Sequence, residues 1–443
     1  MLIEFSVNNF LSFNEAVTLS MVAANPVKEH REDNVFLANR YHLLKSAVIY
    51  GANASGKSNL LKAMRFMKWF VLNSSKESQA DEPINVTPFK LNPATKNKPS
   101  LFEIVFLNNG AKYRYGFQVD KNRITAEWLF RANKVKEFPL FLRQDDGIEV
   151  MRIFKEGKGL EIKTRDNALF LSVCAQFNGE ISIQLMRWFR TNFNHISGIT
   201  DREYAGFTVD MLMKNRYREK IVDFLKIADV GIDDVKIVKI KESSYFREFK
   251  KLFEKLTDEE QKKFLEKSPP EEPEISKKLE SSELITKHTI YDSKKKAAGV
   301  EYFDFDKEES EGTKKYLRLA GPIIDTLLRG AILIVDELDA RLHPSLTRAI
   351  VKLFNSKETN ANNAQLIFAT HDTNILSSEM FRRDQIWFTE KKNDQSTDLY
   401  SLVEFKLANG KVRNDASLEK NYLRGRYGAI PVLGNFKEVV RGA

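Results

Sequence analysis

Hydrophobic and polar residues alternate over the first 20 positions of the chain, as they do in β-strands with one buried face. Ile3, Phe5 and Val7 form the first alternating run, and Val17 and Leu19 form the second. An Asn-Asn pair between the two runs is typical of a turn. Similar patterns predict four more strands, at residues 101–107, 113–119, 124–129 and 148–154. We therefore expect the N-terminal part to build an antiparallel β-lobe.

Near residue 50 the pattern changes to strand followed by helix. The apolar run 47–50 predicts a short buried strand that leads into a glycine-rich loop, and apolar residues recur at helical spacing over 59–72. Residues 167–229 are mainly helical in pattern, and an alternating strand at 301–305 precedes a helix at 316–328. This succession of strands and helices predicts an α/β fold.

The segment 241–280 differs from its surroundings because about half of its residues are charged, with the two signs interleaved. We expect an exposed helix crossed by salt bridges, followed by a flexible linker. A short projecting helical arm that binds a partner is the alternative.

Residues 51–58 read GANASGKS and match the phosphate-binding pattern G-x-x-x-x-G-K-[ST] in full, between a predicted strand and a predicted helix. The glycines let backbone N–H groups curl around phosphates at the positive end of the helix dipole. We expect Lys57 to reach the β- and γ-phosphates and Ser58 to ligate Mg²⁺. The nucleotide-binding residues expected in this loop are Gly51, Asn53, Ala54, Ser55, Gly56, Lys57, Ser58 and Asn59.

A second motif follows the apolar run 332–335, where Asp336 and Glu337 end a strand that is predicted to be buried on both faces. Two adjacent carboxylates in such a place are costly unless they have a chemical task. We expect Asp336 to hold Mg²⁺ and Glu337 to act as the general base on the attacking water. His371 ends another apolar strand, 366–370, and is expected to sense the γ-phosphate.

Ser310 and Gly312 precede Asp336 by about 26 residues, at the start of a predicted helix. The serine suits an N-cap, and the glycine permits close approach of the backbone to an anion. At this spacing the segment resembles the signature loop of ABC-type ATPases, and residues 338–340 (LDA) resemble their D-loop at the dimer seam. His343 is expected to be structural, at the beginning of the next helix.

These motifs combine with an NFLSF sequence at residues 9–13 and with two tail sequences, 384–391 and 422–431. Together they resemble the ABC-type ATPases of the SMC, RecF and OLD group. The chain is most similar to compact prokaryotic AAA family ATP-binding proteins of phage-defence and abortive-infection operons. The Q-loop glutamine of ABC proteins has two candidates, Gln118 and Gln176.

The resemblance implies an ABC-type P-loop ATPase head with ATP and Mg²⁺ as cofactors. It also implies a homodimer, in which Ser310 and Gly312 of one copy close over the γ-phosphate that the other copy holds. A separately encoded effector, a nuclease or toxin, is the expected partner. We expect residues 1–165 to form the N-terminal half of the head, 166–299 a helical and charged insertion, and 300–443 the C-terminal half.

Composition and charge indicate in which compartment the protein is expected. The 443 residues include 70 Lys and Arg against 61 Asp and Glu, a net charge of +9, and a single cysteine. The lone Cys174 fits a reducing compartment. We find neither a signal-peptide pattern nor an apolar run of about 18 residues, so we expect a cytoplasmic protein without a membrane partner.

The motifs and the resemblance leave three functions open. The first is an ATP-driven sensor or switch of an anti-phage defence system, since we see no room for a nuclease domain after His371. The second is a RecF-like or SMC-like DNA-repair ATPase, in which the positive charge contacts nucleic acid. The third is a ribonuclease, because Arg190 and His195 fit the spacing of HEPN ribonucleases in a predicted helical stretch.

Overall fold

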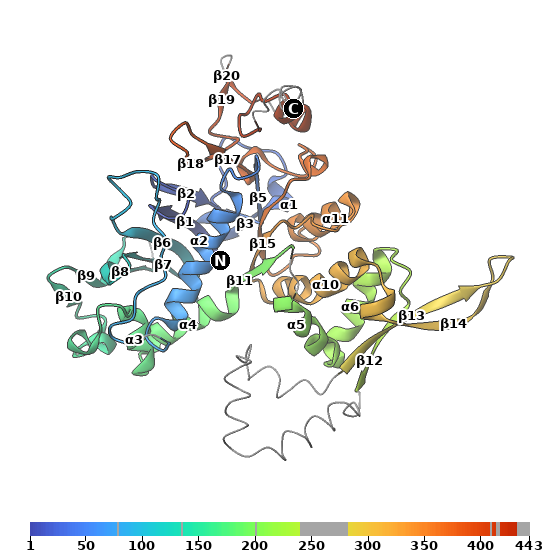
Figure 1. Ribbon diagram of the computed structural model, residues 1–443, viewed down its shortest axis with the longest axis horizontal. Helices are drawn as coiled ribbons and strands as arrows, with labels where there is room; N and C mark the ends of the chain where they lie inside the picture. The colour runs from blue at the N-terminus through green and yellow to red at the C-terminus, as the bar shows by residue number, and fades with distance from the viewer. Residues whose placement is uncertain are drawn as a thin grey trace, which may run out of the picture. The chain divides into compact units, whose positions relative to one another are not determined.

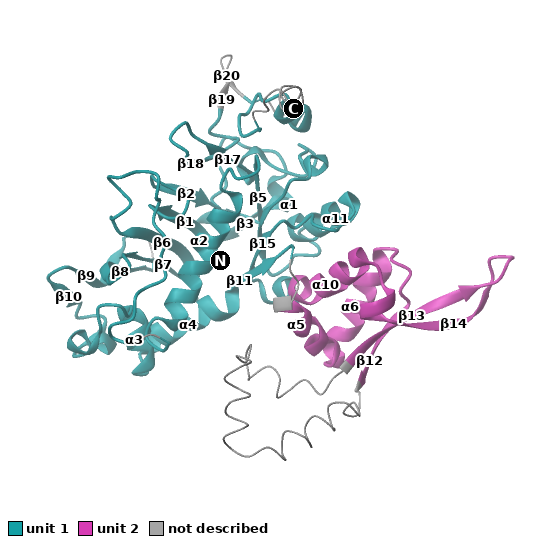
Figure 2. Ribbon diagram, in the orientation of Figure 1, with its two compact units in different colours: residues 1–201, 325–443 teal, residues 202–324 magenta. Residues whose placement is uncertain are grey.

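The computed structural model describes residues 1–77, 79–133, 136–199, 202–239, 282–407, 410–412 and 417–431. The chain forms two compact units (Figure 2). Unit 1 contains residues 1–201 and 325–443, and unit 2 contains residues 202–324.

A six-stranded sheet forms the centre of unit 1. Its strands, in spatial order, are β11 (Phe193–Ser197), β15 (Ile332–Asp336), β16 (Gln365–Ala369), β5 (Ser46–Gly51), β17 (Ile386–Lys391) and β18 (Thr397–Ser401). The first five run parallel and β18 is antiparallel to β17, so the sheet is mixed. Strands β5 and β16 are buried along their whole length, which explains their continuous apolar sequences.

The second sheet of unit 1 is antiparallel and has seven strands. In spatial order they are β10 (Gly147–Val150), β9 (Phe138–Gln144), β8 (Ile124–Ala132), β7 (Ala111–Val119), β6 (Ser100–Asn108), β1 (Leu2–Asn8) and β2 (Val17–Ser20). Two short pairs lie outside the large sheets, β3 (Val35–Ala38) with β4 (Tyr41–Leu44) and β19 (Lys406–Leu407) with β20 (Gly410–Lys411).

Helix α2 (Lys57–Asn73) runs between the two sheets of unit 1 (Figure 1). Its Phe66 ring lies 4.8 Å from that of Phe102 on β6, and Phe70 lies 5.4 Å from Phe117 on β7. The other helices in the described part of unit 1 are α1 (Arg31–Asn34), α3 (Phe170–Gln176), α4 (Glu180–Asn192), α11 (Pro344–Asn355) and α12 (Leu418–Leu423), with 3-10 turns at Lys155–Gly157, Glu161–Lys163, Thr373–Ile375 and Arg383–Gln385. One apolar core therefore joins the phosphate-loop helix to the antiparallel lobe.

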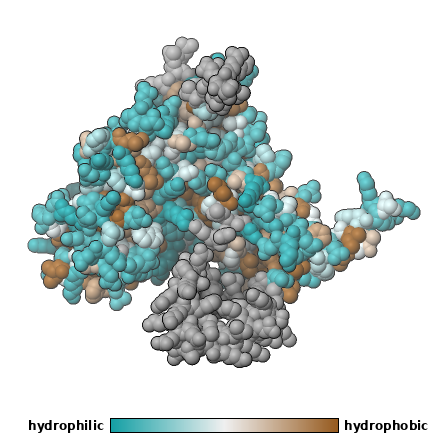
Figure 3. Space-filling model, viewed as in Figure 1, coloured by the Kyte–Doolittle hydropathy of each residue, from teal (hydrophilic) through white to brown (hydrophobic). Residues whose placement is uncertain are grey.

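Unit 2 combines helices with a three-stranded antiparallel sheet. Its elements within the described residues are α5 (Arg202–Leu212), α6 (Asn215–Ile227), β12 (Asp234–Lys239), β13 (Ser282–Tyr291), β14 (Ala297–Asp304), α9 (Phe305–Glu308) and α10 (Glu311–Arg329), whose last turns belong to unit 1. Phe224 of α6 stacks on Tyr316 of α10 with ring centres 4.5 Å apart. On the face drawn in Figure 3, hydrophilic residues dominate and hydrophobic ones form small groups.

The predicted fold class is confirmed: the protein is an α/β protein with a mixed sheet flanked by helices and an antiparallel N-terminal lobe. Several details differ from expectation. The strand predicted at 148–154 ends at Val150, strand β9 was not predicted, and Trp69, one of the apolar residues in the predicted helix 59–72, is 41% exposed. The charged segment 241–280 lies outside the described residues.

The observed units also differ from the expected boundaries at 165/166 and 299/300. Helix α4 and strand β11 belong to unit 1 because they pack on its sheets. Trp188 of α4 stacks on Phe106 of β6 with ring centres 4.0 Å apart, and β11 pairs with β15. Unit 2 therefore begins at residue 202.

Candidate functional site

The phosphate loop connects β5 to α2 and has no room for side chains at its two glycines. Gly56 has a φ of 114°, and a Cβ there would overlap the side chain of Thr397. A Cβ on Gly51 would lie 2.5 Å from the carbonyl oxygen of Thr389. Asn53 and Ala54 are exposed at the tip of the loop, where Ala54 has a left-handed φ of 60°. The glycines therefore form a narrow cradle of backbone, as phosphate binding requires.

Side chains from parts of unit 1 that are distant in the sequence anchor the phosphate loop by hydrogen bonds. The Oγ atoms of Ser55 and Thr389 share a hydrogen bond of 2.6 Å, and Thr397 donates to the Ser55 carbonyl at 2.8 Å. Asn59, in the first turn of α2, donates to Oγ of Ser12 at 2.8 Å. The helix thus begins at Lys57, two residues earlier than predicted, and Asn59 serves to anchor it.

Lys57 lies inside the loop and is buried. Its Nζ donates to the carbonyl oxygens of Gly51 at 2.7 Å and Ala52 at 3.2 Å. Burial lowers the pKa of Lys57 to about 8, although the nearby carboxylates of Asp336 and Glu337 oppose this shift. The ammonium group is therefore poorly solvated, and a bound phosphate anion would stabilise it.

The two predicted Mg²⁺ ligands lie next to each other. Ser58 Oγ donates to Oδ1 of Asp336 at 3.2 Å, although 278 positions separate the two residues in the sequence. Glu337 follows with a left-handed φ of 55°, a conformation that costs a non-glycine residue about 1–3 kcal/mol. This backbone turns the chain sharply at the end of β15, directly after the ligand pair.

Gly198, at the end of β11, lies against the two acidic residues. Its N–H donates to the Asp336 carbonyl at 2.5 Å, and a Cβ would overlap the carbonyl oxygen of Glu337. Sequence analysis missed this contact because the region reads as helical, and β11 has only five residues.

His371 lies two residues beyond the end of β16, near the same charged groups. Burial lowers its pKa, and the neighbouring Lys57 acts in the same direction, whereas Asp339, Glu337 and Asp336 raise it. His371 is therefore neutral near pH 7 and free to accept or donate a hydrogen bond. The buried Oδ1 of Asp339 has no hydrogen-bond partner within the described ranges, which makes it a natural acceptor for a bound water or cation.

The predicted signature residues lie in unit 2. The backbone N–H of Thr313 donates to Oγ of Ser310 at 3.1 Å, so Ser310 caps α10, as its sequence context predicted. Ser310 is exposed and Gly312 is half-buried. His343 caps α11 by accepting the N–H of Ser345 at 3.2 Å, which confirms its structural role.

Other candidates from the sequence have different surroundings. Gln176 donates to the Ser75 carbonyl, and Gln118 lies on β7 of the antiparallel sheet; in the described part of the chain neither bonds to the phosphate loop or to Asp336. The HEPN reading placed Arg190 and His195 in one helical stretch, which is wrong. Arg190 is exposed on α4, whereas His195 lies on β11 with both ring nitrogens buried.

The residues present fit a magnesium nucleotide. The backbone cradle excludes any side chain, Lys57 supplies a buried cation, and Ser58 with Asp336 offers the hard oxygen ligands that Mg²⁺ prefers. The phosphate loop, Asp336 and His371 lie at the carboxyl ends of β5, β15 and β16. This is the edge at which parallel α/β sheets bind ligands.

This fold and this site define the class of the protein: it is an α/β protein with a complete phosphate-binding loop beside an aspartate at the end of a parallel strand. A family model described as "AAA domain, putative AbiEii toxin, Type IV TA system" matches residues 46–377. The match includes three quarters of the chain, so the protein belongs to this family.

Among solved structures, the SMC head domain from Thermotoga maritima is similar at 12% sequence identity. The alignment covers 90% of this chain and 98% of that chain, with a TM-score of 0.40. No curated protein matches the sequence. None of the helices in the described ranges is long and apolar enough to cross a membrane.

Proposed function

We propose that the protein binds and hydrolyses ATP with Mg²⁺. The observation that carries this proposal is the 3.2 Å contact between Ser58 and Asp336 beside a buried Lys57. A serine and an aspartate that meet at the mouth of a phosphate loop have the positions that Mg²⁺ coordination requires. Their convergence from α2 and β15 is difficult to explain as a purely structural contact, since it leaves charged groups partly buried.

Each residue of the site has a role in this proposal. Lys57 and the N–H groups of the loop hold the phosphates, while bound Mg²⁺ would neutralise charge that develops on them. Glu337 takes a proton from the attacking water, and neutral His371 contacts the γ-phosphate. Gly198 supplies no group for the chemistry, but the hydrogen bond from its N–H to the Asp336 carbonyl fixes the backbone that presents Glu337.

We further propose that two copies enclose ATP and act as a switch. Ser310 and Gly312 of one copy would complete the site of the other, so hydrolysis would be slow until a second copy closes over the bound ATP. The family description names a toxin of a type IV toxin–antitoxin system, which supports a role in anti-phage defence. In this role the ATP-bound dimer would hold or release a separately encoded effector in the cytoplasm.

ATP turnover in the presence of Mg²⁺ tests the enzymatic part. We expect Lys57→Ala to abolish nucleotide binding and hydrolysis together. Lys62→Ala removes an exposed lysine from the same helix and is the matched control. Equal turnover by Lys57→Ala and wild-type protein would exclude this site as the ATPase centre.

A second candidate is a DNA-binding ATPase of the RecF or SMC kind. Arg424 and Arg426 are both exposed beside the tail helix α12, and the net charge is +9. Basic groups that contact phosphates make binding strongly dependent on salt. Tight, salt-dependent binding of duplex DNA that is lost in Arg424→Ala/Arg426→Ala would favour this function over the switch.

A further inference from the structure

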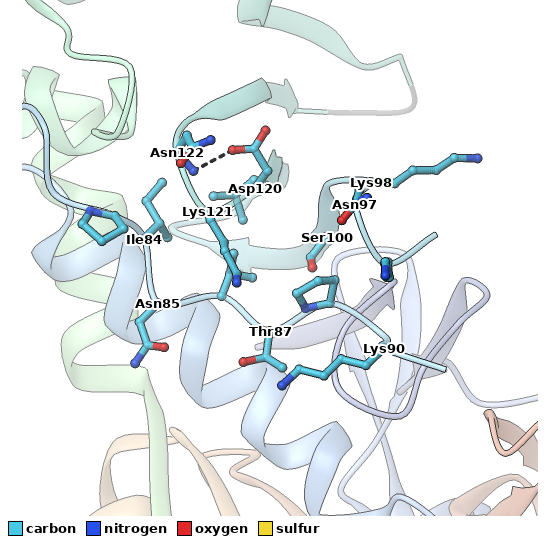
Figure 4. Close-up of a pocket in the computed structure, with 15 residues that line it drawn as sticks. Ile84, Asn85, Thr87, Lys90, Asn97, Lys98, Ser100, Asp120, Lys121 and Asn122 are labelled. Atoms are coloured by element: carbon cyan, nitrogen blue, oxygen red, sulfur yellow. Dashed lines mark hydrogen bonds between the residues drawn. The ribbon is translucent and has the colours of Figure 1, made fainter. Parts of the chain in front are cut away.

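A pocket of about 760 Å³ lies in the antiparallel lobe of unit 1, apart from the phosphate loop. The segment 83–100 forms one side, and the turn 119–122 between β7 and β8 forms the other (Figure 4). The volume falls within the range of about 300–1,000 Å³ that is typical of sites for small molecules. Neither the motifs nor the family accounts for this pocket.

The charge around the pocket is predominantly positive. Four exposed lysines line it, namely Lys90, Lys96, Lys98 and Lys121. Among the described residues none of the four forms an ion pair. Figure 4 shows Lys121 extending toward the opposite wall and Lys90 lying along Thr87, whereas Lys98 points away. Two unpaired ammonium groups therefore remain available to an anionic ligand.

The one carboxylate at the rim does not cancel this charge. Oδ1 of Asp120 accepts the backbone N–H groups of Asn122 at 2.7 Å and Arg123 at 2.9 Å, which holds the turn in shape (Figure 4). The walls also include the buried apolar side chains of Ile84 and Val86, with the amide of Asn85 nearby. Basic, amide and apolar groups together suit a phosphate attached to a heterocyclic base better than a simple ion.

Asn9 connects the wall of this pocket to the N-terminal strand. Its Nδ2 donates to the carbonyl oxygens of Thr95 and Lys98, both at 2.8 Å, and its Oδ1 accepts the N–H of Phe89 at 3.1 Å. Ser100, which lines the pocket, donates to the Asn9 carbonyl at 2.5 Å. The buried side chain of Asn9 thus holds the segment 83–100 at Phe89, Thr95 and Lys98.

The residues that follow Asn9 connect the pocket to the phosphate loop. Leu11 donates its N–H to the carbonyl of Thr87, a pocket residue, and has a left-handed φ of 51° that is rare for a bulky side chain. Ser12 Oγ accepts from Asn59 at 2.8 Å and shares a hydrogen bond of 2.7 Å with Oγ1 of Thr397. Residues 9–12 therefore contact the pocket at one end and the base of the loop at the other.

We propose that the pocket binds a phosphate-bearing ligand of nucleotide size and that residues 9–12 transmit its binding to the phosphate loop. Displacement of the segment 83–100 by the ligand acts on Asn9 and Leu11, and through Ser12 on the first turn of α2. Binding in the pocket is independent of the proposed function, but its consequence for ATP rests on that function. Such coupling is reciprocal, so ATP also changes the affinity of the pocket.

Calorimetric titration in the Lys57→Ala background, without Mg²⁺, tests the pocket alone. The probes are inorganic triphosphate, ATP and a 20-nucleotide single-stranded DNA. We expect triphosphate and ATP to bind, and Lys90→Ala/Lys121→Ala to weaken both by about tenfold or more. Lys155→Ala/Lys158→Ala removes the same charge from exposed lysines elsewhere in unit 1 and should leave both affinities unchanged.

Three results would overturn the binding proposal. They are no binding of triphosphate or ATP at millimolar concentration, an equal loss of affinity in the control pair, or binding of the DNA alone. None of them would count against ATP binding at Lys57, which is measured in protein that retains this lysine.

Hydrogen exchange in the same Lys57→Ala protein tests the transmission. We expect triphosphate to slow exchange in the segment 83–100 and also to change exchange in residues 51–59. Ser12→Ala should keep the first effect and remove the second, whereas Lys90→Ala/Lys121→Ala should remove both. A change confined to the pocket walls in protein that retains Ser12 would overturn the transmission.

Discussion

Lys57 carries a charge that its own surroundings disfavour. Burial removes water from the ammonium group, and only two carbonyl oxygens replace it. A bound phosphate would restore the missing interaction and favour the protonated form. Nucleotide binding above pH 8 must therefore take up a proton at this side chain.

The pH dependence of nucleotide affinity follows from this pKa. With a pKa of about 8 in the free protein, Lys57 is mostly charged at pH 7 and mostly neutral at pH 9. We expect ATP to bind about tenfold more weakly at pH 9 than at pH 7, as measured by calorimetry. Lys57→Arg, which stays charged throughout this range, should bind with nearly the same affinity at both values. An affinity that is independent of pH in the wild type would contradict the proposed protonation.

Glu337 is the other residue whose role can be isolated. Glu337→Gln keeps the size of the side chain but removes the base, so hydrolysis should fall by about 100-fold or more while ATP binding is retained. The same variant should accumulate as an ATP-bound dimer in size-exclusion chromatography. Glu358→Gln, at an exposed position, is the control. Hydrolysis at the wild-type rate in Glu337→Gln would disprove the base assignment.

At the scale of elements, the edge strand β11 supports the acidic pair without contributing a functional side chain. Gly198→Ala would push a methyl group into the backbone of Glu337, where only the main chain can move. We expect ATP hydrolysis to fall by tenfold or more and the melting temperature to decrease. Gly206→Ala on α5 has open space around it and should be neutral or stabilising. An unchanged hydrolysis rate in Gly198→Ala would show that β11 does not support the site.

The tail sequence that begins at residue 384 has a structural explanation. Arg382, which is 1% exposed, forms a buried ion pair with Asp384 at 2.7 Å and donates to the carbonyls of Glu29 and Val27. Gln385 donates to Oγ of Ser46 at 2.8 Å, at the start of β5. This satisfied polar network sets the position of β17 beside the strand that carries the phosphate loop.

Loss of the buried arginine should therefore destabilise the head. Arg382→Met leaves the Asp384 carboxylate buried without its partner, and we expect the free energy of unfolding to fall by about 3–5 kcal/mol in urea denaturation. Arg382→Met/Asp384→Leu should recover part of this loss, because no charge then stays unpaired. Arg152→Met, at an exposed position, should have little effect. A similar loss in single and double variants would point to packing instead of charge.

The sequence predicted those parts of the site that local chemistry determines. The phosphate loop, the acidic pair after β15 and His371 after β16 each follow an apolar strand, so their common location could be inferred from the fold class. The residues that hold the site in place could not be inferred in this way. Gly198, Thr389 and Thr397 act through backbone shape or one hydroxyl group, and nothing in their local sequence marks them. Strand β11 is short and follows directly on a helix, so its pairing with β15 dominates its local preference.

At the scale of the whole molecule, the proposed dimer predicts that two defective copies can repair each other. Ser310→Arg should bind ATP but not hydrolyse it, because the arginine blocks the approach of the signature segment. Lys57→Ala should do neither. In an equal mixture, a mixed dimer combines one intact Lys57 with one intact Ser310, so the mixture should recover roughly a quarter of the wild-type hydrolysis rate.

Ser310→Thr, which retains an N-cap hydroxyl, is the control for the helix itself. If neither mixing nor a higher protein concentration restores hydrolysis, the signature segment does not act across a dimer. Loss of ATP binding in Ser310→Arg would show that this residue has a different role.

The order of strands in the central sheet has a consequence for how the head holds together. Strands β11 and β5 precede unit 2 in the sequence and β15, β16, β17 and β18 follow it, yet in space the two sets interleave. Neither set makes the sheet by itself. A proteolytic cut between residues 202 and 324 would therefore yield two fragments that remain interlocked through backbone hydrogen bonds, with the nucleotide site intact. Two separate segments of the chain therefore build the central sheet together, and fragments that are expressed together should associate.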